Sequence, residues 1–141
     1  MSYQVRKALA GIDLFAGLPE DTLEDLVQRG TTFTTNPGHV VVTEGSKDVG
    51  LQVILEGTAE VTVHGEPRLP MKAGDYFGEI SMIDGSPRSA TVISGPEGLK
   101  TFALSALAFA PMLDRPDVSR VLLKALCARI RSIQSAAPTG S

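Results

Sequence analysis

The chain has 141 residues, a formal net charge of −3 and a single cysteine, Cys127. This length is typical of one domain, and an apolar fraction of 43% is enough for one core without disulfides or metals. The net negative charge and the absence of a basic stripe argue against direct binding to nucleic acid. No apolar run reaches the roughly eighteen residues of a membrane span, and the first ten residues lack a signal-peptide core, so we expect a cytoplasmic protein without a membrane segment.

The opening segment, residues 1–35, is expected to form a helical lead. Leu23, Leu26 and Val27 recur at the spacing of one helix face, and Pro19 ahead of them suits a first helical turn. Short helices are therefore predicted before the first strand.

Residues 36–104 are expected to form an antiparallel β-roll, or jelly roll. Short runs rich in β-branched residues are separated by glycines such as Gly45, Gly50 and Gly57, so the chain turns often between strands. Strands that recur about every eight to twelve residues are typical of a sandwich or barrel. The predicted strands are 40–43, 51–55, 59–64, 76–77, 90–94 and 100–104. The fold class is therefore α+β, and mainly β.

The chain returns to helical patterns over residues 105–135, where a hinge and lid pair of helices is expected. The first covers 106–113 and is interrupted by Pro111, and the second covers 117–135. Cys127 falls in the apolar stripe of the second helix, so an inert buried thiol is expected in preference to a redox switch. The apolar residues of that stripe are Val118, Val121, Leu122, Ala125, Leu126, Ile130 and Ile133.

The helices and the roll together predict a single domain over residues 1–135. Residues 136–141 are small or are proline and glycine, so a disordered tail is expected there.

The segment that carries chemistry is 77–92. Gly78 allows a ligand to approach the backbone closely, and residues 79–83 can form one helical turn whose free N–H groups point at an anion. Arg88 offers a planar fork of donors that matches phosphate oxygens. Glu79 can accept a hydrogen bond from a ribose hydroxyl, as acidic residues do in dinucleotide-binding folds. Taken alone, Glu79 and Arg88 could equally form a structural salt bridge.

The whole segment resembles a known family motif. Phe-Gly-Glu-Ile-Ser at 77–81 and Pro-Arg-Ser-Ala-Thr-Val at 87–92 resemble the phosphate-binding cassette of the cyclic nucleotide-binding domain family. The resemblance covers roughly residues 9–133 and includes a β-roll glycine pattern. Outside the cassette it is carried by Gly38, Gly45, Gly57, Gly74, Asp75, Leu14, Phe15 and Leu18.

The resemblance implies a role for each matching residue. Glu79 would take the ribose 2′-hydroxyl, Arg88 the cyclic phosphate, and Val61 would line the base pocket. The backbone around Gly78, Ile80, Ser81, Ser89 and Ala90 would complete the cradle. The implied ligand is cAMP, with cGMP left open because Ser89 occurs with either purine, and no cofactor is implied.

The sequence lacks several features that other members of this family carry. No helix-turn-helix follows the last helix, no second β-roll is present, and the pattern fits a stand-alone bacterial member. No aromatic residue follows Asp117, so a lid over the base would be aliphatic. Its candidates are Leu122, Leu126 and Ile130.

Three functions are compatible with this sequence. The first is a sensor in which bound cyclic nucleotide moves the C-terminal helices and signals to an unknown protein effector. The second is a β-roll that no longer binds nucleotide and docks a protein partner or a second copy as a homodimer. A hydrolytic enzyme ranks third, because His39 and His64 form no metal-ligand pattern and no nucleophile lies beside a base.

Overall fold

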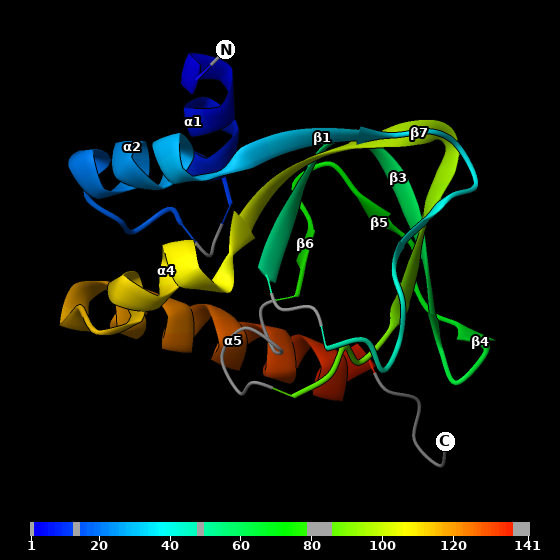
Figure 1. Cartoon of the computed structure of the whole chain (residues 1–141). Helices are drawn as coiled ribbons and strands as arrows, with labels where there is room; N and C mark the ends of the chain where they lie inside the picture. The colour runs from blue at the N-terminus through cyan, green and yellow to red at the C-terminus, as the bar shows by residue number, and fades with distance from the viewer. Residues whose placement is uncertain (1, 13–14, 48–49, 79–85, 137–141) are drawn as a thin grey trace.

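Two long antiparallel strands form the frame of the molecule, β3 Gly50–Val63 and β7 Thr91–Ser105 (Figure 1). The structure is a computed structural model. It describes residues 2–12, 15–47, 50–78 and 86–136. The shorter strands are β1 Thr31–Thr35, β2 Val40–Val42, β4 Glu66–Pro67, β5 Met71–Lys72 and β6 Tyr76–Phe77. They complete one antiparallel sheet with the path β1-β7-β3-β4, in which β2 pairs with β7, and β5 and β6 pair with β3. The predicted mainly β fold, an antiparallel roll flanked by helices, is confirmed.

Each long strand replaces two strands that the sequence predicted as separate. In β3 the pairing register with β7 shifts near Gly57, and the strand continues to Val63. Gly57 has a φ of +89°, and a Cβ there would overlap the carbonyl oxygen of Gly98. A bulge of this kind bends a strand without ending its ladder. Gly57 was therefore wrongly interpreted as a break between strands, because it marks a bend within one continuous ladder, whereas Gly45 does lie between two strands.

Strand β1 lies inside the segment that was expected to be a helical lead. It pairs with β7 from Thr31, opposite Ala103, to Thr35, opposite Leu99. Its first four residues are exposed. An edge strand without a buried face has no apolar alternation, so the pattern that usually predicts a strand was missing here.

Four helices are described: α1, α2 and α4 lie beside one end of the sheet in Figure 1, and α5 runs from there below the roll. Their bounds are α1 Ser2–Ala10, α2 Glu20–Arg29, α4 Ala106–Leu113 and α5 Pro116–Ala136. Ser105 caps α4, because its Oγ accepts the backbone N–H of Ala108 at 3.1 Å. The predicted interruption at Pro111 is wrong: α4 continues through it, since a proline there removes only one backbone hydrogen bond.

Two cores lie on the two faces of the β3–β7 ladder. One core joins the helices to the sheet, with Phe109 of α4 and Leu122 of α5 packed alongside Phe102 of β7. The other fills the interior of the roll and includes Ile54 and Val92. Side chains alternate between the two faces along each strand, so a single ladder serves both cores.

Helix α5 buries only part of the stripe that its sequence predicts. Val118, Leu122 and Ala125 are buried, whereas Ile130 is 55% exposed. The expected burial of Cys127 is also wrong, because its side chain is exposed. Position 127 lies two residues beyond Ala125, about 200° around the helix from it, and so faces away from the core.

The predicted tail, residues 136–141, lies outside the described residues except for Ala136, the last residue of α5. Within the described ranges, none of the helices is both long and apolar enough to cross a membrane.

Candidate functional site

Strand β6 delivers the chain to the candidate site. Tyr76 and Phe77 pair with Val53 and Gln52 of β3, and Gly78 follows directly. Tyr76 packs in the helix-facing core and Phe77 in the interior core, so the segment is anchored on both faces of the sheet. Gly78 therefore enters the cassette from a fixed position.

Gly78 is confined by its neighbours as well as by its own backbone. Its φ is +94°, a conformation that L side chains rarely adopt. A Cβ at this position would overlap the carbonyl oxygen of Gly50 and the guanidinium of Arg88. Only glycine fits, and its lack of a side chain lets Arg88 lie directly against the backbone.

Arg88 is held in a buried position by backbone groups. The residue is 7% exposed, and its Nη1 donates to the carbonyl oxygen of Gly50 at 2.9 Å. Its own N–H donates to the carbonyl of Ser46 at 2.8 Å, and its carbonyl accepts the N–H of Gly45 at 2.9 Å. Two backbone hydrogen bonds to the turn after β2 and one side-chain hydrogen bond to Gly50, the first residue of β3, thus hold both the backbone and the side chain of Arg88.

The turn that holds Arg88 is the Gly45-Ser46-Lys47 segment. The N–H of Ser46 donates to the carbonyl of Thr43 at 3.0 Å, which closes a tight turn. Glu44 N–H donates to the hydroxyl of Thr91 at 2.9 Å, so the same turn is also tied to the first residue of β7. The segment is thus a turn that joins the cassette to the start of β7.

Val61 projects into the interior of the roll. It pairs directly with Val92, which is buried in the interior core, and residues opposite each other in a ladder share a face. Ser89 is exposed and Ala90 is half-buried, and both lie between Arg88 and the start of β7. Gly78, Arg88 and Gly50 contact one another. Val61, in the second half of β3, faces the interior of the roll.

Three predicted site residues, Glu79, Ile80 and Ser81, lie outside the described residues. The predicted helical turn at 79–83 and the alternative of a salt bridge between Glu79 and Arg88 fall on residues outside the described ranges as well. Their roles remain predictions.

Sequence reasoning missed the backbone partners of Arg88. Gly45, Ser46 and Gly50 act through N–H and C=O groups that every residue carries, so their residue types gave no signal. Gly50 was interpreted only as a separator between strands, and Gly45 as a separator and as part of the glycine pattern of the family. A search for segments able to pair with the cassette could have found them, because two glycines flank the short turn.

The histidines make ordinary structural contacts. His64, at the β3–β4 turn, donates from Nδ1 to Glu44 Oε2 at 3.0 Å, and its backbone N–H donates to Glu44 Oε1 at 2.8 Å. The backbone N–H of His39 donates to Ser94 Oγ at 3.0 Å. Within the described ranges, no three His, Cys, Asp or Glu side chains gather into a group that could hold a metal ion.

Residues 33–115 match the family model described as the cyclic nucleotide-binding domain. A cAMP-dependent protein kinase regulatory subunit from Yarrowia lipolytica is 41% identical over 64 residues, which is 44% of this chain and 17% of that protein. A cGMP-dependent protein kinase from Toxoplasma gondii is 31% identical over 87 residues, which is 62% of this chain and 9% of that protein. The chain thus spans less than a fifth of the length of these relatives.

A solved structure shares the fold. The regulatory domain of Toxoplasma gondii PKA, crystallised with cAMP, superposes with a TM-score of 0.78 at 22% identity, over 90% of this chain and 50% of that one. The residues matched by the family model, 33–115, contain strands β2 to β7, both Gly78 and Arg88, and helix α4. The chain belongs to the cyclic nucleotide-binding domain family.

Proposed function

We propose that this regulatory domain prefers cAMP as its ligand and that Arg88 binds the cyclic phosphate. The observation that carries the proposal is the buried guanidinium of Arg88, fixed by Gly50 and lying against Gly78. A guanidinium presents a planar set of donors that matches phosphate oxygens, and its attraction to an anion is stronger where water is excluded. A positive charge is therefore held in place before the ligand arrives.

The remaining predicted residues would surround the rest of the ligand. Gly78 lies against the Arg88 side chain, and Ser89 and Ala90 follow Arg88 in the chain. We assign the backbone N–H groups of these three residues to the phosphate as well. Val61 faces the interior of the roll, which suits an apolar wall for the base. We also assign Glu79 to the ribose hydroxyl, with Ile80 and Ser81 adding backbone groups.

The preference for cAMP rests on the relatives. A cAMP-dependent kinase subunit is the more similar of the two relatives above, at 41% identity against 31% for the cGMP-dependent kinase. Ser89 is compatible with either purine, so the base preference is the part of the proposal that needs direct measurement.

Calorimetry with cAMP, cGMP and 5′-AMP tests this proposal. We expect both cyclic nucleotides to bind, cAMP more tightly, and 5′-AMP to bind at least about tenfold more weakly because its phosphate is not cyclic. At one hundred times the dissociation constant, cAMP should stabilise the fold by about 2.7 kcal/mol in a thermal-shift assay. Binding of neither cyclic nucleotide would overturn the site assignment, whereas tighter binding of cGMP would overturn only the purine preference.

We propose that the signal leaves through α4 and α5. Tyr76 belongs to the same core as Phe109 of α4 and Leu122 of α5, and it lies two residues before Gly78. A ligand that reorders the cassette can therefore shift the packing of Tyr76 against these helices. Different contacts in the free and bound states are what allow a ligand to move the helix population.

A distance measurement between spin labels tests the helix movement. Cys127 is exposed and is the only cysteine in the sequence, so it can be labelled together with Lys72→Cys on β5. We expect cAMP to change the distance distribution between these labels. A control pair at Thr34→Cys and Lys72→Cys, made in a Cys127→Ser background, should not change. An unchanged distance in the first pair, with cAMP bound, would contradict a moving α5.

We propose further that the chain works by binding rather than catalysis, in the cytoplasm, and passes its signal to a protein effector or a second copy. The exposed apolar residues on α4 and α5, Leu107, Leu123 and Ile130, are suitable contact points.

Three measurements test these roles. Conversion of cAMP to AMP during incubation would contradict a purely binding role. Light scattering with and without cAMP tests for a homodimer. Partner capture that ignores cyclic nucleotide, with no thermal shift, would favour the alternative of a non-binding interaction module.

A further inference from the structure

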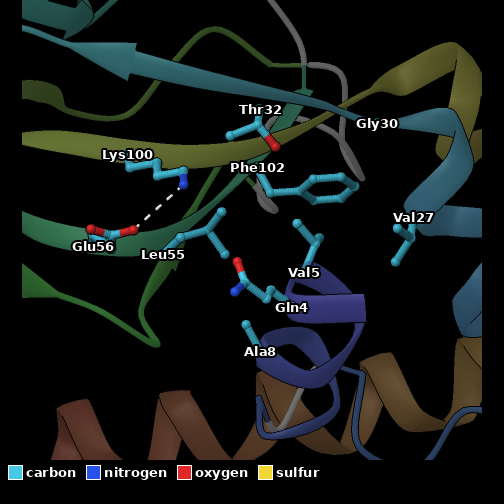
Figure 2. A pocket seen from close by; sticks show the side chains of 10 residues that line it. All are labelled: Gln4, Val5, Ala8, Val27, Gly30, Thr32, Leu55, Glu56, Lys100 and Phe102. Carbon is cyan, nitrogen blue, oxygen red and sulfur yellow. Dashed lines mark ion pairs between the residues drawn. The ribbon is translucent and has the colours of Figure 1, made fainter. Parts of the chain in front are cut away.

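A cavity of about 260 Å³ lies between α1 and the helix-facing side of the sheet (Figure 2). Its walls are apolar, with Val5 from α1, Val27 from α2, and Leu55 and Phe102 from the β3–β7 ladder. Figure 2 shows these side chains converging on the space, with the Lys100–Glu56 ion pair at one end. None of the residues assigned above to the nucleotide site lines it.

The sheet separates this cavity from the interior of the roll. Ile54 lies directly opposite Thr101 in the ladder, and both are buried, with Ile54 in the interior core. Leu55 and Phe102, the next residues along each strand, pack with the helix-facing core. Because side chains alternate between faces, a ligand beside Leu55 and Phe102 is on the other side of the sheet from the interior core.

The backbone at Gly30 helps to keep the cavity open. A Cβ at Gly30 would overlap the far end of the Phe102 ring, so this end of the ring lies against the Gly30 backbone and forms one wall. Phe102 is buried and belongs to the core, which limits how far its ring can move. The wall is therefore formed before any ligand binds.

The charged end of the cavity favours an anion. Lys100 Nζ lies 3.5 Å from Glu56 Oε2, longer than the roughly 2.7–2.9 Å of a tight charge-assisted hydrogen bond. The Lys100 side chain is 38% exposed and that of Glu56 is 72% exposed, so the cation is the more enclosed charge. A weakly held and exposed ion pair contributes little stability, so Lys100 can exchange Glu56 for another carboxylate.

We propose that this cavity binds a small amphipathic carboxylate, with its apolar body against Leu55 and Phe102 and its carboxylate on Lys100 in place of Glu56. The volume is below the roughly 300–1,000 Å³ of pockets for drug-sized ligands, so the ligand has on the order of ten non-hydrogen atoms. Gln4 and Thr32 at the wall offer further hydrogen-bonding groups. A bound ligand would join α1 to the ladder and hold that helix in place.

Phenylacetate is a suitable probe, because it carries one apolar ring and one carboxylate. In a titration of methyl-labelled protein followed by NMR, we expect saturable shifts of the Val5 and Leu55 methyl signals with a Kd on the order of 1 mM. Phenylacetamide and phenethylamine, which share the ring but lack the negative charge, should bind at least about fivefold more weakly. Tighter binding of phenethylamine would make Glu56 the anchor and overturn the proposal.

Two surface variants test the charge exchange in opposite directions. Lys100→Gln removes the anchor and should weaken phenylacetate binding by about fivefold. Glu56→Gln removes the competing carboxylate and should tighten it by about two- to fivefold. Both side chains are partly exposed, so neither change disturbs the core. The same direction of change in both variants would contradict the proposal.

A cavity-filling variant tests the location. Ala8 of α1 lines the cavity, so Ala8→Leu should abolish the Val5 and Leu55 shifts, while Ala110→Leu at an exposed position of α4 should leave them unchanged. Unaltered melting temperatures would show that both variants fold. Persistence of the shifts in folded Ala8→Leu would overturn the assignment.

The nucleotide site is a competing place for a carboxylate, because Arg88 also attracts anions. The titration is therefore repeated with saturating cAMP and in Arg88→Ala, where we expect the same Kd for phenylacetate. Displacement by cAMP, or loss of binding in Arg88→Ala, would place phenylacetate on Arg88 and overturn this proposal while leaving the proposed nucleotide function intact. Absence of phenylacetate binding in protein that still binds cAMP would overturn it as well.

Discussion

Arg88 and Lys100 are the cations of the two proposed sites, and the fold holds them in different ways. Arg88 is 7% exposed and is held by hydrogen bonds to backbone groups of the turn after β2 and of Gly50, the first residue of β3. Lys100 is partly exposed and has one ion pair with Glu56, at 3.5 Å. One cation is fixed by the backbone, and the other is held by a side chain that can move away.

This difference determines how each cation can take part in binding. A charge fixed before binding loses little conformational freedom when its ligand arrives, so more of the interaction energy appears as affinity. A mobile charge in partial contact with water must first give up its existing partner and some of its hydration. We therefore expect strong binding at Arg88 and weak, exchangeable binding at Lys100.

The largest effect is expected from Arg88→Ala. Removing the buried partner of a phosphate should cost roughly 2–5 kcal/mol of cAMP affinity, or about 30- to 5,000-fold in Kd measured by calorimetry. Lys100→Ala is the matched control, and its effect on cAMP binding should stay within about twofold because it lies on the other face of the sheet. Equal losses in the two variants would remove the distinction between the two cations.

Gly78→Ala tests how tightly the surroundings of Arg88 are built. The added methyl group requires a φ that alanine avoids and overlaps Gly50 and Arg88, so we expect a loss of roughly 2–5 kcal/mol in the free energy of unfolding by urea. Gly38→Ala is the control, because Gly38 also has a positive φ, of +74°, but nothing lies near its Cβ position. It should cost only about 1–2 kcal/mol. Identical costs in the two variants would mean that the positive φ alone destabilises Gly78→Ala, with no contribution from the overlap with Gly50 and Arg88.

The smallest effect is expected at the Lys100–Glu56 pair. A double-mutant cycle with Lys100→Ala and Glu56→Ala should give a coupling energy of at most about 1 kcal/mol in low salt. The coupling should fall towards zero in 1 M salt, where the screening length is about 3 Å. A coupling above about 2 kcal/mol that resisted salt would show that Lys100 is firmly held, and would contradict its exchange between partners.

The elements that the sequence predicted well are those whose own side chains carry the pattern. The buried stripe of α2, with Leu23, Leu26 and Val27, follows from helical periodicity. Strand β6 at Tyr76–Phe77 was also found. Strand β1 was missed because its threonines are exposed on an edge, and Gly57 was interpreted as a break because a bulge and a turn use the same residue type.

The sequence by itself determined the order of the cassette residues, including Gly78 and Arg88, and the periodic faces of the main helices. Only the tertiary structure decided that Arg88 meets Gly50 and Ser46, 38 and 42 positions away along the chain. The physical reason is that these partners act through backbone carbonyls, which are the same in every residue and are selected by where the strands bring them. The cavity beside Leu55 and Phe102 arises in the same way, because it exists only where α1 is placed against the ladder.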